Sequence, residues 1–188
     1  MIEAEVKALV RDPDRVRALL RSRAAERLSR YYDTYYDRPG RPLTQAGQEL
    51  RLRIIDEGGQ RRCLLTYKEP AVDEQTGSKP ETEIDVSDAD ATDQILAGLG
   101  FTHLVAFEKN CANYAFTVAG RDILATLVTI PELDGTFIEV ETLTADPGDI
   151  GPAIADVRAI LDELGIGSTD LTTELYTDAV MHYRQSYK

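Results

Sequence analysis

Short segments in which hydrophobic and polar residues alternate recur along most of this chain. In the first seven residues, Ile2, Ala4 and Val6 alternate with three charged side chains. A period of two is typical of a β-strand, whose successive side chains point to opposite faces. The same pattern predicts further strands at 31–37, 48–56, 61–69, 81–86, 101–116, 121–129 and 136–142. Most of these segments are close enough for hairpins, which predicts an antiparallel arrangement of about eight strands.

Helical patterns lie between and after these strands. Asp12-Pro13 is a helix start, and the segment that follows is predicted to be helical to about Ser29. Further helices are predicted at 87–100, 152–164 and 169–184, and the polar stretch 71–79 is predicted to be a mobile loop. No internal repeat or linker interrupts the chain, so we expect residues 1–188 to form a single α+β domain.

The composition of the chain restricts the kinds of molecule that the protein could bind. The 188 residues are 43% hydrophobic and 29% charged, as in a soluble globular protein, and the formal net charge of -12 argues against a nucleic-acid-binding or membrane-binding surface. The start of the chain lacks the pattern of a signal peptide, and no apolar run is long enough to span a membrane, so we expect a cytoplasmic protein. Cys63, Cys111 and two histidines have no metal-ligand spacing, which disfavours a zinc site.

The polar sides of the strands carry charges of both signs. The acids are Glu3, Glu5, Glu81, Glu83, Glu139 and Glu141, and the bases are Lys7, Arg51, Arg53, Lys68 and Lys109. If helices cover the apolar sides, a closed eight-stranded barrel must point these charges into its lumen, which is wide enough for one small ligand. The alternative is a sandwich with solvated charged faces, whose surface ion pairs contribute little to stability. The alternation alone leaves both arrangements open.

A charged lumen would favour a particular kind of ligand. Carboxylate oxygens bind Mg²⁺ or Mn²⁺, and lysine and arginine side chains bind phosphate. Buried charges must also be neutralised, by one another or by a ligand. A lumen with both signs of charge therefore predicts a metal-bound polyphosphate.

Several of these segments match, in chain order, the motifs of a known family. The matches are E-x-E-x-K at 3–7, D-T-Y-x-D at 33–37, L-R-x-R at 50–53, L-T-x-K-x-P at 65–70, E-x-E at 81–83, Lys109 and Tyr114 on a V-x-K-x-R-x-x-Y strand, and F-x-E-x-E at 137–141. Through them the sequence resembles the CYTH family of triphosphate tunnel metalloenzymes, which includes class IV adenylate cyclases and thiamine triphosphatases. The resemblance covers nearly the whole chain.

The resemblance implies an eight-stranded antiparallel closed barrel, or tunnel, with a charged lumen and with helices packed outside. Its partners would be a small-molecule triphosphate or another phosphorylated substrate together with Mg²⁺ or Mn²⁺, and a homodimer is a further expectation. The implied metal ligands are Glu3, Glu5, Glu139 and Glu141, and Glu81 and Glu83 would be supporting acids. The implied phosphate-binding residues are Lys7, Arg51, Arg53, Lys68 and Lys109, of which Lys7, Arg53 and Lys68 are expected to be catalytic.

Two positions depart from the family pattern. The arginine of the K-x-R strand falls on Cys111, and the family's metal-binding aspartate, in an L-D-x-V pattern, falls on Thr126. A thiol cannot replace the guanidinium fork that clamps a phosphate. Because the segment 129–135 looks longer than usual, the alignment could slip, and Asp122 or Asp134 could then substitute for the missing aspartate.

Several reactions fit the implied site. One is cyclisation of ATP to cyclic AMP and pyrophosphate, which the D-T-Y-x-D and L-T-x-K-x-P elements favour, and another is hydrolysis of a triphosphate by water. The departures at Cys111 and Thr126 support a third interpretation. In it the protein acts on another substrate, such as a diphosphate ester, or binds a nucleotide or polyphosphate without turnover.

Overall fold

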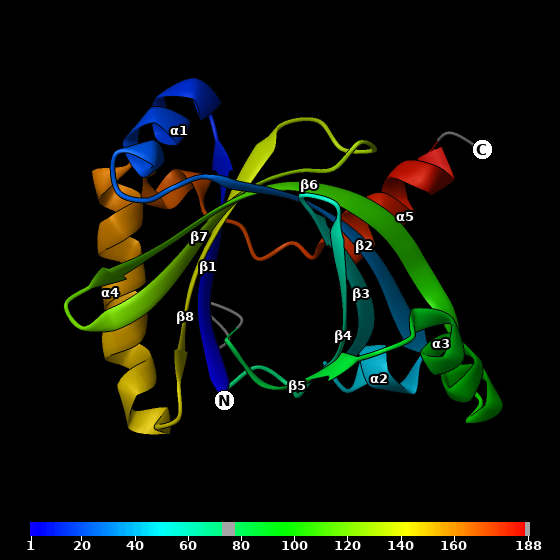
Figure 1. Cartoon of the computed structure of the whole chain (residues 1–188). Helices are drawn as coiled ribbons and strands as arrows, with labels where there is room; N and C mark the ends of the chain where they lie inside the picture. The colour runs from blue at the N-terminus through cyan, green and yellow to red at the C-terminus, as the bar shows by residue number, and fades with distance from the viewer. Residues whose placement is uncertain (73–77, 187–188) are drawn as a thin grey trace.

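Eight antiparallel strands form a closed barrel in the computed structural model, which describes residues 1–72 and 78–186 (Figure 1). The strands are β1 Ile2–Val10, β2 Arg27–Asp37, β3 Glu49–Glu57, β4 Gln60–Lys68, β5 Lys79–Val86, β6 Thr102–Val118, β7 Arg121–Thr129 and β8 Thr136–Thr144. Around the barrel their order is β1-β5-β4-β3-β2-β6-β7-β8, and β8 closes on β1. The predicted α+β class and eight-stranded antiparallel barrel are confirmed.

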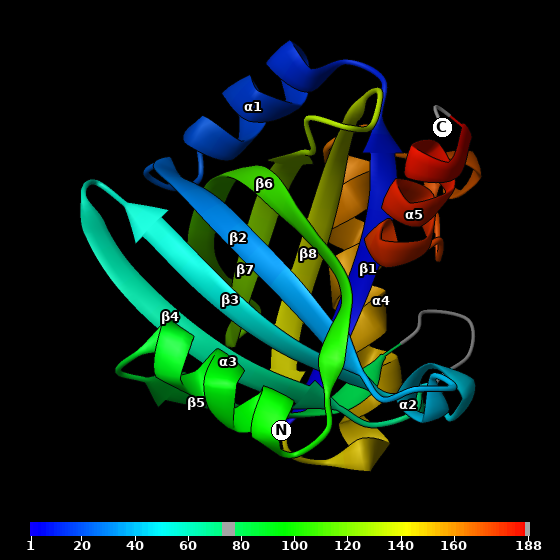
Figure 2. The same cartoon turned by 90° about the vertical axis from the view of Figure 1, so that its right-hand side faces the viewer.

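The helices lie outside the ring of strands or at its end. They are α1 Pro13–Arg21, α2 Pro42–Gln45, α3 Ala89–Gly98, α4 Ile150–Glu163 and α5 Tyr176–Ser186. Figures 1 and 2 show α1 and α4 beside β1, β7 and β8, whereas α3 lies on the other side of the barrel, against β3. Asp12 caps the start of α1, since its carboxylate accepts a hydrogen bond from the Arg15 amide at 3.1 Å.

The main hydrophobic core lies between the outer face of the barrel and α4. The side chains of Ala4, Val140 and Val157 are fully buried there. Burial of a single valine or isoleucine contributes about 1.5–3 kcal/mol to stability, so a whole face of such residues fixes which side of β1 and β8 points outward. Because the apolar faces are covered by helices, the charged faces point into the lumen, and the solvated-sandwich alternative is wrong.

One end of the barrel is filled by apolar side chains and α5. Phe107 and Val128 of the inner face and Ile130, which follows β7, pack there with Tyr176 and Val180 of the helix. The lumen is therefore charged along one part and apolar where α5 packs. This arrangement brings the beginning of α5 to the charged part of the tunnel.

The helix boundaries differ from the sequence-based prediction in two places. The first helix ends at Arg21, and not near Ser29, because residues from Arg27 onward already pair with β6. The helix predicted at 169–184 begins only at Tyr176, because Leu171 forms a bridge with Ala8 in β1. Most of the predicted loop at 71–79 lies outside the described residues, and β5 begins at Lys79. None of the described helices is long and apolar enough to cross a membrane.

Candidate functional site

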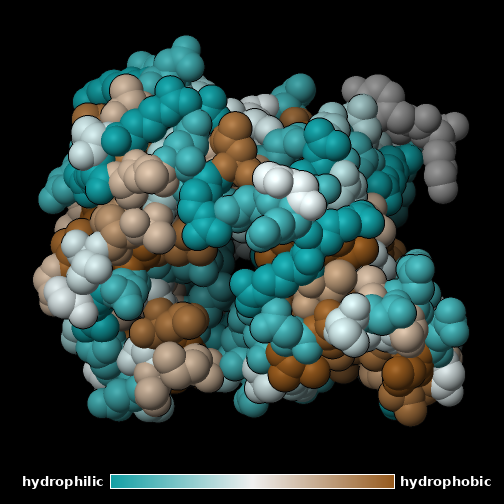
Figure 3. All heavy atoms as spheres, in the orientation of Figure 1, coloured by the Kyte–Doolittle hydropathy of each residue, from teal (hydrophilic) through white to brown (hydrophobic). Residues whose placement is uncertain are grey.

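The barrel encloses a cavity of about 350 Å³ whose walls carry charges of both signs. In Figure 3 a hollow near the middle of the surface is bordered by hydrophilic residues. The acids that line the cavity are Glu3, Glu5, Glu49, Glu81, Glu83, Glu139 and Glu141, and the bases are Lys7, Arg51, Arg53, Arg62, Lys68, Lys79 and Lys109. All the charged residues that the sequence singled out thus lie in one cavity.

Three of the carboxylates lie close together. Oxygen atoms of Glu3, Glu5 and Glu141 are all within 4.8 Å of one another, since Glu5 and Glu141 face each other across the β1–β8 pair. Burial, Glu3 and Glu139 raise the pKa of Glu5 to about 7, and burial, Glu3 and Glu5 raise the pKa of Glu141 well above its usual range. Carboxylate oxygens that are partly buried and lie this close together are suitable ligands for a hard divalent cation such as Mg²⁺ or Mn²⁺.

Glu139 has different surroundings from these three acids. It lies opposite Lys7 in the β1–β8 pair, and its carboxylate is 3.3 Å from the ammonium group of Lys109. Although burial opposes ionisation, Lys109 and Lys7 lower the pKa of Glu139. Glu139 is therefore an ionised partner of two lysines in this structure, and its role as a metal ligand stays a prediction.

The two arginines of β3 have different partners. Arg53 forms a bidentate ion pair with Asp33 of β2, with N–O distances of 2.6 and 2.7 Å, and the Asp33 side chain is fully buried. Arg51 donates a hydrogen bond to Thr66 at 3.3 Å, and Glu83 lies 3.8 Å away. The Nε group of Arg51 is buried without a partner among the described residues. A buried donor without a partner is available to a bound anion.

The remaining lysines contact acids or backbone. Lys68 forms ion pairs with Glu3 and with Glu81, the latter at 3.1 Å, and it links the acid cluster to β5. Lys7 donates a hydrogen bond to the backbone carbonyl of Glu174. Glu81 and Glu83 thus contact Lys68 and Arg51, as the role of supporting acids requires, although that role stays a prediction.

Cys111 and Thr126 belong to an uncharged part of the inner wall. Thr126 pairs with Glu139 on β8 and with Asn113 on β6, so its side chain faces the lumen. Thr126 and Tyr31 both donate hydrogen bonds to the Oδ1 atom of Asn113, at 3.0 and 3.2 Å, and the Asn113 amide donates to Ser29 at 2.6 Å. Burial raises the pKa of Cys111 to about 12, so its thiol stays neutral.

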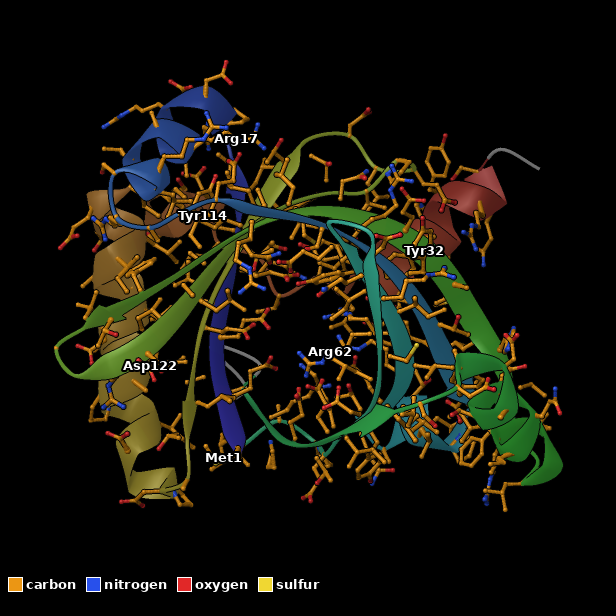
Figure 4. All side chains as sticks on the ribbon, in the orientation of Figure 1. Met1, Arg17, Tyr32, Arg62, Tyr114 and Asp122 are labelled. Atoms are coloured by element: carbon orange, nitrogen blue, oxygen red, sulfur yellow. The ribbon has the colours of Figure 1, made fainter. Side chains whose placement is uncertain are left out.

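Neither proposed substitute for Thr126 lies in this wall. Asp122 is exposed at the β6–β7 hairpin, where it accepts a hydrogen bond from Thr117, and Figure 4 places it beside α4. Asp134 is exposed in the loop before β8. Tyr114, which matched a family strand motif, lies in the outer core under α1, where its hydroxyl donates to Glu26 (Figure 4).

Several residues of the cavity were not among the predicted site residues. Glu49 and Lys79 form an ion pair at 2.5 Å, and Tyr176 enters from α5. Arg62 lines the cavity and is labelled within the barrel opening in Figure 4, while it also pairs with Asp85 at 2.7 Å. The alternation of β3 could have indicated Glu49, but no periodic signal distinguishes Tyr176.

Comparison with known proteins gives a family match over most of the chain. The CYTH domain matches residues 1–176. The putative adenylate cyclase MJ0240 of Methanocaldococcus jannaschii is 26% identical over 180 residues, which cover 95% of this chain and 98% of that protein.

Solved structures are similar over the same length. The PH1819 protein from Pyrococcus horikoshii OT3 is 28% identical, with a TM-score of 0.84 over 96% of this chain and 98% of that chain. A Hippeastrum protein described as a putative adenylyl cyclase with a dominant triphosphatase activity is 18% identical, with a TM-score of 0.67 over 97% of this chain and 96% of its own, which shows the common fold. With its strand motifs inside a closed barrel and a domain match over residues 1–176, this chain belongs to the CYTH family.

Proposed function

We propose that this protein is a divalent-metal-dependent enzyme that acts on the phosphate chain of a small-molecule triphosphate. The observation that carries the proposal is the acid cluster of Glu3, Glu5 and Glu141 beside seven basic side chains within one cavity of about 350 Å³. Cations that surround a phosphate chain stabilise the charge that develops during phosphoryl transfer, and no protein nucleophile is required. The names of the related proteins support the same class of substrate.

The basic residues would bind and orient the phosphate chain. Arg51, with its buried and unpartnered Nε, has a donor ready for a phosphate oxygen. Arg53 is held in one orientation by its two bonds to Asp33, so its remaining face would be presented to the ligand at little entropic cost. Lys7, Lys68 and Lys109 would add point charges around the chain.

The acid cluster would hold the metal ion. Glu3, Glu5 and Glu141 have the oxygen donors that Mg²⁺ and Mn²⁺ prefer, and the raised pKa of Glu5 indicates that burial and the neighbouring acids outweigh the nearby lysines Lys68 and Lys7. A bound divalent cation would polarise phosphate oxygens and help to position the nucleophile. Lys68, which contacts both Glu3 and Glu81, would keep the cluster next to the phosphate-binding residues.

A product analysis would test the proposal and separate its two reactions. The protein is incubated with ATP, inorganic triphosphate or thiamine triphosphate, with Mg²⁺ or Mn²⁺ or with EDTA, and the products are separated by chromatography. Cyclic AMP with pyrophosphate would identify a cyclase, and orthophosphate would identify a triphosphatase. No metal-dependent product from any of the three substrates would contradict the proposal.

A second candidate is suggested by the uncharged wall around Cys111 and Thr126. The hydrogen bonds of this wall converge on Asn113, and the described residues of the wall include no basic side chain that could contact a phosphate chain. The protein would then act on a shorter phosphate chain, such as a diphosphate ester, or bind polyphosphate without turnover. In that case, combining Cys111→Arg with Thr126→Asp should raise triphosphate turnover, because the pair restores a phosphate clamp and the metal-binding aspartate of the family pattern. Equal turnover of the double variant and the wild type would count against this candidate.

A further inference from the structure

The segment before α5 brings a tyrosine to the charged part of the tunnel. Leu171 forms a bridge with Ala8, and the amide of Thr172 donates to the carbonyl of Lys7 at 2.9 Å, so the segment is tied to β1. The chain then passes Glu174, whose carbonyl accepts a hydrogen bond from the Lys7 side chain. Tyr176, at the start of α5, is thereby placed in the wall of the cavity.

The ring of Tyr176 contacts two of the basic residues. The Nζ atoms of Lys7 and Lys109 each lie 4.3 Å from the centre of the ring, within the range of a cation–π interaction. Phe137 packs edge-on against the same ring, with 5.4 Å between the ring centres. The aromatic ring thus holds two ammonium groups of like charge near each other, and Phe137 fixes the ring.

The hydroxyl group of Tyr176 has no such support. The residue is only 7% exposed, and its buried hydroxyl oxygen is not in hydrogen-bond geometry with any described group, although the Glu139 carboxylate lies close by as a potential acceptor. Burial and the nearby Glu139 raise the pKa of Tyr176, so the hydroxyl keeps its proton. A buried donor without a good partner is costly, and such a group in a native protein calls for an explanation, such as a catalytic role or a bound water or ion.

We propose that Tyr176 is a ligand-contacting residue, whose hydroxyl donates a hydrogen bond to a phosphate oxygen while its ring positions Lys7 and Lys109. This inference rests on the proposed function, because it assumes that the tunnel binds a phosphate chain. It extends the site beyond the charged strand residues to α5. Tyr176, Lys7 and Lys109 would then contact the same end of the phosphate chain.

The test is a titration of the full-length protein with inorganic triphosphate in the presence of Mn²⁺, measured by calorimetry. Tyr176→Phe removes only the hydroxyl, and a lost hydrogen bond to a charged group should weaken binding by about tenfold. Tyr176→Ala also removes the ring, so it should weaken binding further. Tyr183→Phe is the matched control, because Tyr183 is on the same helix but is 38% exposed and does not line the cavity.

Thermal unfolding without ligand separates a binding role from a structural one. Because the hydroxyl makes no hydrogen bond of good geometry with the described groups of the empty tunnel, not even with the nearby Glu139, Tyr176→Phe should melt at the same temperature as the wild type or higher. Wild-type affinity in Tyr176→Phe, or a clear loss of its thermal stability, would overturn the inference while leaving the proposed function intact. Failure of the wild type itself to bind triphosphate would overturn both.

Discussion

At the scale of single residues, the tunnel contains acids in two electrostatic situations. Glu139 is next to two lysines, which lower its pKa, whereas Glu5 is next to other acids and has a pKa of about 7. The difference in pKa follows from the register of β1 with β8, which places Glu5 beside Glu141 and Glu139 beside Lys7. A divalent cation would remove the repulsion among the acids of the cluster, and stability should therefore report on metal binding.

The pKa of Glu5 gives a prediction for the pH dependence of stability. A carboxyl group whose pKa is raised on folding from 4.5 to about 7 stabilises the folded state fully below its unfolded pKa, and this contribution is lost as the pH rises through 7. Without metal, the free energy of unfolding should fall by up to about 3 kcal/mol between pH 5 and pH 8 from this group. Glu5→Gln should show a smaller fall in urea unfolding, and should lose the stabilisation that Mg²⁺ or Mn²⁺ gives the wild type at pH 8.

The control for this prediction is Glu163→Gln. Glu163 is 63% exposed and pairs with Arg23 on the outer surface. Its substitution should leave both the pH profile and the metal response unchanged. If Glu5→Gln and the wild type have the same profile with and without metal, the interpretation of the acid cluster is wrong.

The ion pair of Asp33 and Arg53 should be important for stability as well as for binding. Removal of the buried Asp33 carboxylate would leave the guanidinium group uncompensated inside the barrel. We expect Asp33→Ala to lower the free energy of unfolding by about 3–5 kcal/mol. Asp85→Ala, which breaks an exposed pair with Arg62, should cost at most about 1 kcal/mol. Equal losses in urea unfolding would refute the claim that burial determines the effect.

At the scale of secondary structure, each strand has two separate tasks. The outer face of β1 packs on α4 through Ala4, Val6 and Ala8, and the inner face carries the acids and Lys7. Because the two faces alternate with a period of two, the strand positions could be predicted from the sequence. The ends of the helices could not be predicted, because the local sequence pattern contains no information on which distant strand a segment pairs with.

The segment 169–176 illustrates this limit. Its residues gave an acceptable helical pattern, but the pairing of Leu171 and Thr172 with β1 keeps it extended. Likewise, the arginine-rich segment before Ser29 continued the helical pattern of α1, whereas pairing with β6 makes it a strand from Arg27 onward. In both cases a tertiary contact overrides local propensity.

The core beneath α4 should determine stability without affecting the site. Leu161 is 1% exposed in this core, and Leu161→Ala should lower the free energy of unfolding by about 2–5 kcal/mol. Asp162→Ala changes the next, exposed residue of the helix and should alter stability by at most about 0.5 kcal/mol. Both variants should bind metal and triphosphate like the wild type at a temperature at which they are folded. Loss of binding in a folded Leu161→Ala protein would show that core and site are coupled.

At the scale of the whole molecule, closure of the barrel is what creates the site. Residues from β1, β3, β4, β5, β6 and β8 are far apart in the sequence but line one cavity. The alternating pattern of each strand identified the charged strand residues, and the resemblance to the CYTH family, not the alternation alone, predicted that they line a lumen. The sequence did not predict Tyr176, because the packing of α5 into the end of the barrel depends on Phe107, Val128 and Ile130 together.

The division of the lumen into charged and uncharged parts also emerges only from the assembled barrel. Thr126 and Cys111 looked like two isolated departures in the sequence, but the structure joins Thr126 to a network on Asn113 with Tyr31 and places Cys111 on the same inner wall. The register of β7 with β8 also fixes Thr126 opposite Glu139. The pairing of the strands therefore determines where Thr126 lies in the lumen, which a sequence motif alone does not.

The most direct test of the central claim is a calorimetric titration of the wild-type protein with inorganic triphosphate at pH 8, with Mg²⁺, with Mn²⁺ and with EDTA. If the tunnel binds a metal-bound phosphate chain, binding should be strong with at least one of the metals, much weaker with EDTA, and lost or strongly weakened when Glu5→Gln or Glu141→Gln is titrated in the same way. Absence of binding with both metals, or equal binding in the wild type and in both variants, would contradict the account.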